Sequence, residues 1–373
     1  MIIQSTTLPN GLRVITDTVP TVESVALGVW CDVGTRHEDM ADNGVAHMVE
    51  HMMFNGTPSR SAQDIVEQIE GVGGQMNAYT SREVTAYYVH LLKEDTEKAI
   101  DVLSDMLQRP TFPDTELEKE RGVILQEIGM SLDTPDDLVF DLYQETAYPG
   151  QALGAPILGS TDIVQQMSKE TLFDYVRGYY TPQNLVLSAA GNLEHSQIVA
   201  WAERYFSELP QDKPKVILNA AYEGGEKRQD KELEQAHIVL GFEGIEKSND
   251  HYYAALLLST IMGGGMSSRL FQEVREKRGL VYATYAAHTA YSDSGQFEIY
   301  AGTGAEKLPE LMPVITDELN KISQNVVTSE ELDRAKSQLR ASILMGRESM
   351  MSRINRQAKY LIAFDEEVNI QDI

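Results

Sequence analysis

Short stretches in which hydrophobic and polar residues alternate predict an antiparallel sheet near the start of the chain. In residues 6–18, Asn10-Gly11 separates two extended segments, and this dipeptide is typical of a hairpin turn. A third strand is expected in residues 24–34, and residues 76–92 again alternate around a short polar turn. We therefore expect the N-terminal part of the chain to be built on a sheet.

Hydrophobic residues three to four positions apart predict helices between and after these strands. The helix that starts at residue 43 is followed by one in 61–74, where Ser61 is a suitable N-cap and Gly71 to Gly74 end the helix. Helices are also predicted in residues 93–108, 114–132 and 168–180, and a strand is predicted in 183–193. This order of elements is typical of a domain that contains both helices and strands.

The same order of elements returns in the second half of the chain. Residues 209–234 are rich in proline, glycine and charge, as in a linker, and a strand, two helices, a pair of strands and a further helix follow. Residues 77–91 and 288–302 each place a tyrosine, a polar turn and an alternating strand before a helix. We therefore predict an α+β fold with two tandem homologous domains, 1–208 and 235–373, each an antiparallel or mixed β-sheet packed with helices.

Chain length and composition agree with two domains. The 373 residues, with 42 % hydrophobic content, are enough for two hydrophobic cores. The single cysteine, Cys31, is expected to be a half-buried strand residue rather than a nucleophile. The sequence has no apolar stretch of about 18 residues, and its N-terminus lacks the pattern of a signal peptide. We expect a cytoplasmic protein that does not insert into a membrane.

Net charge narrows the class of binding partner. The 57 acidic and 31 basic residues give a formal charge of −26, which repels nucleic acid and anionic membrane surfaces. Such a charge either keeps the protein in solution or attracts basic peptides to an acidic surface. We therefore expect no nucleic acid among the partners.

The stretch GVAHMVEHMMFNGT, residues 44–57, places two histidines and a glutamate in an apolar run. On a helix His47, Glu50 and His51 share one face, because they occupy positions i, i+3 and i+4. Two neutral imidazoles on one face are suitable zinc ligands, and a carboxylate beside them can accept a proton from water. The His-x-x-Glu-His spacing is that of the inverzincins. The alternative interpretation, a surface carboxylate and two ordinary histidines, leaves costly polar groups in an apolar run.

A third metal ligand is expected from the helix predicted in residues 114–132. Glu116, Glu120 and Glu127 lie in it, and the last two are two helical turns apart on one face. One glutamate would complete the metal site, while another would orient a histidine from outside the ligand shell. Spacing alone does not choose between the three.

Several motifs together resemble the pitrilysin-type zinc peptidases, in particular the bacterial branch similar to the mitochondrial processing peptidase. They are PNGLRV, VGTRHED, HMVEH, GGQMNAYTSREVTAYYVHLL, ERGVILQEI, YYTPQNLVLSAAGNL and GGGMSSRLFQEVREKRGLVYATYAAHTAYSDSG, and they span nearly the whole chain. The resemblance implies one Zn²⁺ per chain, with His47, His51 and Glu127 as ligands. It also implies Glu50 as the general base and Glu120 as the carboxylate that supports a ligand.

The resemblance also implies functional residues outside these two helices. In this family an arginine and a tyrosine of the second domain, seven residues apart, enter the active site, and REKRGLVY supplies Arg275 and Tyr282 at this offset. Without this resemblance, the usual burial of these residue types would predict that Arg275 is a solvent-exposed helix residue and Tyr282 a core residue of a strand. Backbone groups near Asn77 and Ala78 are implied to bind an extended peptide at the edge of a sheet.

These residues together predict a zinc-dependent metalloendopeptidase that cleaves peptides or unfolded precursor segments, with the zinc site in residues 1–208. Family members of this length form half of a clam-shaped chamber, which implies a homodimer or a heterodimer with a related subunit. The chain ends at EEVNIQDI, where family members usually continue, so a truncated second domain is expected. The alternatives are a non-catalytic, peptide-binding partner subunit of a heterodimeric processing peptidase, and a zinc hydrolase of non-peptide substrates.

Overall fold

The computed structural model describes residues 2–210 and 218–367, and these form two compact units. Unit 1 takes the described residues of Met1–Gly129, Ala155–Leu218 and Gly346–Ile373, and unit 2 takes Met130–Gly154 and Asn219–Met345. The predicted domain boundaries, 1–208 and 235–373 with a linker at 209–234, describe a repeat in the sequence, whereas the two units are defined by contacts in space. The predicted boundaries therefore stay a prediction. Residues 211–217 of that linker and 368–373 of the predicted truncated end lie outside the described residues.

Unit 1 is built on a six-stranded sheet with the strand order β1-β2-β6-β3-β5-β4. The strands are β1 (Ile2–Thr7), β2 (Arg13–Thr18), β3 (Ser24–Cys31), β4 (Gln75–Thr80), β5 (Thr85–Leu92) and β6 (Leu185–Gly191). Neighbouring strands are antiparallel except for β2 and β6, which are parallel. The predicted hairpin at the start of the chain is confirmed, and β4 lies at an edge of the sheet.

Helices cover both faces of this sheet. The helices of unit 1 are α1 (Val45–Met52), α2 (Ala62–Glu70), α3 (Thr96–Gln108), α4 (Asp114–Asp133, up to Gly129), α6 (Thr161–Gln166), α7 (Lys169–Tyr179), α8 (His195–Tyr205) and α12 (Met350–Phe364). Along β3, Leu27 and Val29 face a core shared with α1, α3, α7 and α8, while Ala26 and Trp30 face α12. Because both faces are buried, β3 is a continuous apolar run, and Cys31 is fully buried rather than half-buried.

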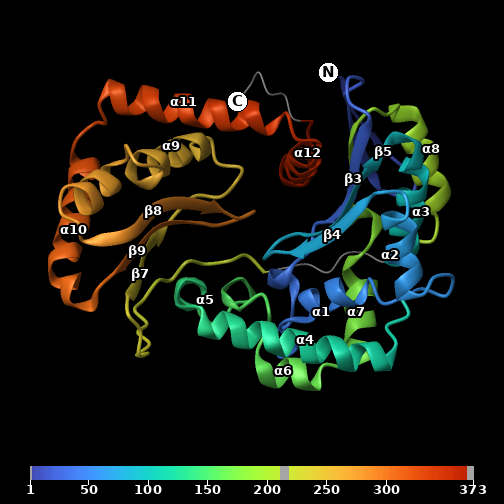
Figure 1. Cartoon of the computed structure of the whole chain (residues 1–373), viewed down its shortest axis with the longest axis horizontal. Coiled ribbons are helices and arrows are strands. Elements are labelled where there is room, and N and C mark those ends of the chain that lie inside the picture. Colours follow the sequence, from blue (N-terminus) through green and yellow to red (C-terminus); the bar gives the residue numbers. More distant parts are fainter. Residues whose placement is uncertain (1, 211–217, 368–373) are drawn as a thin grey trace. The chain divides into compact units, whose positions relative to one another are not determined.

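The helix that covers the second face comes from the end of the chain. Met350, Ile354, Ala358 and Leu361 of α12 lie on one helical face, and all four are buried against β2, β3, β5 and β6. Gln357 adds hydrogen bonds to the β6 strand, to the Oγ of Ser188 (2.8 Å) and the carbonyl of Ala189 (3.0 Å). Figure 1 shows α12, in red, beside β3.

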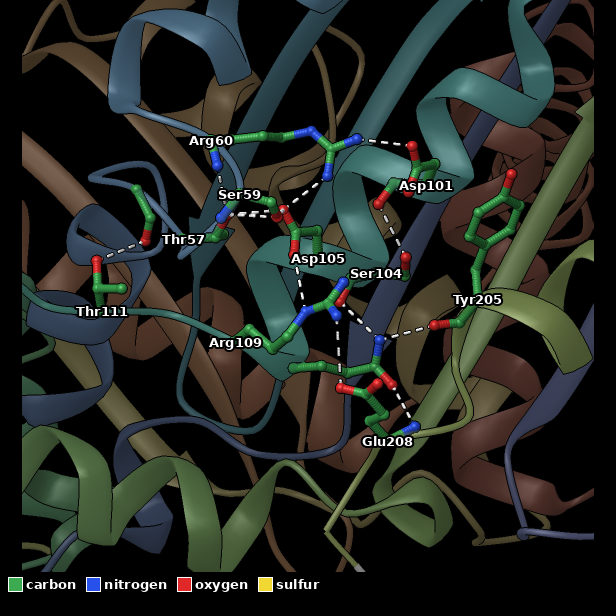
Figure 2. A network of polar contacts seen from close by, with 12 residues as sticks. Thr57, Ser59, Arg60, Asp101, Ser104, Asp105, Arg109, Thr111, Tyr205 and Glu208 are labelled. Atoms are coloured by element: carbon green, nitrogen blue, oxygen red, sulfur yellow. Dashed lines mark hydrogen bonds and ion pairs between the residues drawn. The ribbon is translucent and has the colours of Figure 1, made fainter.

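A buried carboxylate on α3 holds the loop that follows α1 (Figure 2). The fully buried Asp105 accepts hydrogen bonds from the hydroxyls of Thr57 (2.7 Å) and Ser59 (2.8 Å) and from the guanidinium of Arg60 (2.6 Å). Its other oxygen accepts one from Arg109 (2.9 Å). Four donors compensate the cost of burying this charge, and they fix residues 57–60 against α3.

Unit 2 contains a three-stranded antiparallel sheet with the order β7-β9-β8. Its elements are α5 (Pro135–Ala147), β7 (Ala236–Glu243), α9 (Tyr252–Gly263), β8 (Val281–Ala290), β9 (Gly295–Thr303), α10 (Leu308–Gln324) and α11 (Ser329–Gly346). α10 shares a core with the sheet, and α9 packs on β8. α5 packs on β7, and its Phe140 stacks on Tyr285 and Tyr300. The second of the two helices expected between the strands of this half contains a π-helix over Phe271–Glu276.

The hairpins β4–β5 and β8–β9 have the same local structure. Ser81 N–H donates to the carbonyl of Val84 (2.8 Å), and Tyr291 N–H donates to the carbonyl of Ser294 (2.8 Å). A short 3₁₀ turn and a long helix, α3 or α10, follow each hairpin. The expected α+β fold is confirmed, and the sequence echo between residues 77–91 and 288–302 corresponds to this repeated hairpin. Within the described residues, no helix combines the length and the apolar content needed to cross a membrane.

Candidate metal centre

Helix α1 presents His47, Glu50 and His51 on one side because its other side is anchored in the core of unit 1. The helix begins after Gly44, whose φ of 97° is in the left-handed region that favours glycine. A Cβ atom at Gly44 would also lie 2.9 Å from the Cα of Gly159. Val45, Ala46, Met48, Val49 and Met52 are all buried, so the three polar side chains are the ones left to face α4.

The structure brings three potential ligand atoms together, from His47, His51 and Glu127. Oε2 of Glu127 lies 3.7 Å from Nε2 of His47 and 3.8 Å from Nε2 of His51, and the three ligand atoms lie within 4.8 Å of one another. These separations are too long for hydrogen bonds. They approach the roughly 3.4 Å expected between two atoms that bind one zinc ion at about 2.0–2.2 Å. Two imidazole nitrogens and one carboxylate oxygen are a donor set that fits zinc.

Glu120 lies outside this group and contacts His51. Nδ1 of His51 donates to Oε2 of Glu120 (2.9 Å), which leaves Nε2 of the same ring directed at Glu127. The other oxygen of Glu120 accepts a hydrogen bond from Asn55 (3.1 Å). The hydrogen bond from His51 lowers the pKa of Glu120, so this carboxyl is ionised and orients the ring. Glu116, the other candidate, pairs with Lys119 instead (2.7 Å).

Burial shapes the protonation of the two histidines. It lowers the pKa of His47 to about 4, with a further contribution from His51, so His47 is the neutral imidazole that a metal requires. Burial also acts against protonation of His51, but Glu120 and Glu127 outweigh it and raise the pKa of that ring. Nδ1 of His47 is buried and has no hydrogen-bond partner among the described residues. The protein therefore orients His51 more firmly than His47.

Glu50 lies beside the three potential ligands and has the properties of a base. Burial raises the pKa of its carboxyl, and the neighbouring charge of Glu127 adds to this shift. The nearby hydroxyl of Thr80, which is buried and has no hydrogen-bond partner within the geometric limits among the described residues, opposes the shift. A raised carboxyl pKa favours proton uptake near neutral pH. Thr80 is the last residue of β4, so this strand reaches the candidate site.

The backbone of β4 has hydrogen-bonding groups at Ala78 that take no part in the ladder with β5. The hydrogen bond that closes the hairpin at Ser81 places the hydrogen-bonded pairs with β5 at Ser81, Tyr79 and Asn77. The N–H and C=O groups of Ala78 therefore point away from β5, to the free edge of the sheet. In the free chain Oδ1 of Asn77 accepts the N–H of Ala78 (2.8 Å). The predicted contacts with a peptide substrate thus fall on the backbone of Ala78. The roles of Asn77 and Ala78 in substrate binding stay predictions.

Arg275 and Tyr282 lie together within unit 2. The guanidinium of Arg275 sits over the ring of Tyr282, 5.7 Å from its centroid, and also over that of Phe271. Arg275 is in the π-helix, and Tyr282 is 74 % exposed at a break in the β8–β9 register. Such irregular backbone is frequent at functional sites, and a bulge re-aims a side chain. Their predicted contribution to the metal site concerns the other unit and stays a prediction.

Two contacts of this site escape sequence reasoning. Asn55 follows His51 by four residues, so helical spacing would have placed it near the same helix end, but nothing in its type signals a bond to Glu120. Thr80 lies in the motif NAYTS, and only the fold reveals that its side chain faces Glu50.

The α+β fold and the His-His-Glu group beside a glutamate define a candidate metalloenzyme. Residues 13–161 match the family model described as "Insulinase (Peptidase family M16)", and residues 166–339 match "Peptidase M16 inactive domain". Relatives include "Uncharacterized zinc protease YmxG" of Bacillus subtilis, 40 % identical over 98 % of this chain and 90 % of its own length. A zinc protease of Rickettsia felis is 42 % identical over 98 % of this chain and 89 % of its own. The chain therefore belongs to the insulinase family of peptidases, M16.

Solved structures support the same fold. A protease from Helicobacter pylori has a TM-score of 0.90 and 24 % identity, over 98 % of this chain and 90 % of its own. A peptidase M16 inactive domain from Pseudomonas fluorescens has a TM-score of 0.87 and 22 % identity, over 99 % and 95 % of the two chains. At these identities the likeness concerns the fold alone.

Proposed function

We propose that this protein is a zinc-dependent metalloendopeptidase of the branch similar to the mitochondrial processing peptidase. The observation that carries the proposal is the convergence of His47, His51 and Glu127 beside Glu50. Family membership and the zinc protease names of the relatives support it. The family model for the second half is described as an inactive domain, which agrees with a metal site that lies wholly in unit 1.

His47, His51 and Glu127 would hold one zinc ion. When bound, zinc supplies Lewis-acid chemistry, because it polarises a carbonyl and makes water more acidic. The carboxylate of Glu50 accepts the proton of the attacking water and then transfers it to the amine that leaves. Glu120 keeps the ring of His51 in the orientation and tautomer that leave Nε2 free. Arg275 and Tyr282 would donate hydrogen bonds to the oxyanion.

The substrate would be an extended peptide or an unfolded precursor segment. A peptide that adds to the free edge of β4 would form hydrogen bonds with the backbone of Ala78. This mode of binding recognises the main chain of the peptide rather than its side chains. The net charge of −26 favours basic peptides. A homodimer, or a heterodimer with a related subunit, would complete the enzyme.

The proposal is tested with the variant Glu50→Gln, because the amide keeps the size of the carboxylate but accepts no proton. We expect about one zinc per chain in the wild type and the variant, and cleavage of a quenched basic peptide by the wild type alone. Glu116→Gln, a carboxylate on the same helix as Glu127 but outside the metal group, serves as the control and should keep full activity. Zinc without cleavage in the wild type would favour the alternative, a non-catalytic, peptide-binding partner subunit. A wild type without zinc would refute the zinc-dependent function.

A further inference from the structure

A buried carboxyl outside the metal group contacts the start of α1. Glu38 is 7 % exposed and lies in the turn that precedes the helix. Its Oε1 accepts the N–H of Ala46 (2.8 Å), and its Oε2 accepts the N–H of Gly44 (2.9 Å) and the amide Nδ2 of Asn43 (2.8 Å). All three donors thus come from the four residues at the entry to the helix.

These hydrogen bonds supply what the sequence of α1 lacks. The first N–H groups of a helix have no partner within the helix, and a side chain at the N-cap usually accepts one of them. Gly44 is the N-cap here and has no side chain. Glu38 takes over this role from six residues upstream. His47 is the third residue of α1 and therefore lies in its first turn.

Glu38 is itself tied to the body of unit 1. The hydroxyl of Tyr175 on α7 donates to the carbonyl of Gly34 (3.2 Å), and the hydroxyl of Tyr179 donates to the carbonyl of His37. Asn43 also donates to the carbonyl of Pro156 (3.0 Å). The turn that carries Glu38 is therefore fixed to α7, so this carboxyl contacts the helix α1 from a fixed position.

Burial of Glu38 is costly, and its three hydrogen bonds offset part of this cost. Burial raises the pKa of this carboxyl to about 8, while the hydrogen bonds from Ala46, Gly44 and Asn43 oppose the shift. A buried carboxyl is stabilised only through such donors, and two of the three are backbone groups of the helix that carries the histidines.

We propose that Glu38 is a positioning residue of the metal centre, which fixes the first turn of α1 and thereby the placement of His47 and His51 relative to Glu127. The inference rests on the proposed function only in that the metal is zinc and the reaction is peptide hydrolysis. Glu38 touches none of the ligands, so its effect is transmitted through the backbone of Gly44 and Ala46.

The experiment compares Glu38→Gln with Asp105→Asn. Each variant replaces a buried carboxylate of unit 1 by the amide of the same size, but Asp105 holds the loop 57–60 beyond the other end of α1 (Figure 2). In Glu38→Gln an amide NH₂ replaces one acceptor and faces a backbone N–H. We expect its zinc affinity, measured by chelator competition, to fall about tenfold. For Asp105→Asn we expect a lower thermal midpoint but a zinc affinity within about twofold of the wild type.

Kinetics provide a second measurement. Glu38→Gln should lower kcat while KM stays within about twofold, because Glu38 has no bond to β4, where the peptide would bind. Unchanged zinc affinity and kcat in Glu38→Gln would overturn the proposal. Equal losses in both variants at equal loss of thermal midpoint would also overturn it, since general destabilisation would then explain the effect.

A milder variant covers the case in which Glu38→Gln does not fold. Asn43→Ala leaves Glu38 with its two backbone donors, and we expect a loss of zinc affinity of about threefold; no loss would contradict the inference. If the wild type binds zinc but cleaves no peptide, the proposed function fails, while the zinc affinities still decide the role of Glu38. A wild type without zinc would overturn both.

Discussion

Nδ1 of His51 lies 2.9 Å from Oε2 of Glu120, and Asn55 holds the other oxygen of that carboxylate. This chain of contacts predicts graded losses of zinc affinity. Glu120→Ala should weaken zinc binding by about 10- to 100-fold, since the ring of His51 loses its orienting partner. Asn55→Ala should weaken it less, by a few-fold, because it removes only the support of Glu120. Chelator competition measures both.

The control for these variants is Glu118→Gln on the same helix. Glu118 is exposed and pairs with Arg121, so the zinc affinity of the Glu118→Gln variant should equal that of the wild type. If Asn55→Ala weakened zinc binding more than Glu120→Ala, the order of support from Asn55 through Glu120 to His51 would be wrong.

The free edge of β4 predicts opposite effects for proline at two neighbouring positions. Ala78→Pro removes an N–H group that points away from β5, so the sheet should remain intact while KM for an extended peptide rises about tenfold or more. Asn77→Pro removes a donor of the β4–β5 ladder and should lower the thermal midpoint instead. Thermal unfolding and steady-state kinetics on both variants separate the two effects. A normal KM in Ala78→Pro would argue against peptide binding at this edge.

An ion pair in unit 2 predicts a dependence of stability on pH. Arg269 binds both oxygens of Glu331 (2.6 and 3.0 Å), and together with donors from Thr328 it lowers the pKa of Glu331 to about 2. A carboxyl with a lowered pKa stabilises the folded state above its unfolded pKa of about 4.3 and loses this contribution as the pH falls toward 2. Glu331→Gln should therefore cost about 1–3 kcal/mol at pH 7 and much less near pH 2.

Urea unfolding at pH 7, 3 and 2 measures this difference. Glu330→Gln, an exposed neighbour in the same first turn of α11, should cost little at any pH. A cost for Glu331→Gln that stays constant down to pH 2 would show that the ionisation of Glu331 has no part in it.

The packing of α12 predicts that a substitution near the end of the chain destabilises unit 1. Ile354 is fully buried among residues of β2, β3 and β6. Ile354→Ala should lower the free energy of unfolding by about 2–5 kcal/mol. Ser352→Ala, at an exposed position of the same helix, should cost less than about 1 kcal/mol. Hydrogen exchange can locate the loss, which we expect in the six-stranded sheet.

Much of the local structure follows from the sequence because hydrophobic period and turn residues act over short distances. Ser61 caps α2 as predicted, and Asn10-Gly11 lies between β1 and β2. The destination of α12 does not follow, because an amphipathic pattern shows that a helix buries one face but not which sheet covers it. Spacing alone likewise did not choose among Glu116, Glu120 and Glu127, because the choice depends on the direction of α4 in space, and only the family resemblance pointed to Glu127. The sequence does not reveal the role of Glu38, since a carboxyl that is buried in the fold looks like any charged loop residue in the sequence.

The two units exchange segments: α5 lies in unit 2 although its neighbours in the sequence belong to unit 1, and α12 does the reverse. During synthesis, one face of the six-stranded sheet, with Ala26 and Trp30, stays bare until α12 leaves the ribosome. The nascent sheet therefore exposes an apolar surface until residues 350–364 have been made, and such transiently exposed surface is prone to aggregation. An N-terminal fragment that ends at the predicted linker would lack α12 and would expose this surface permanently.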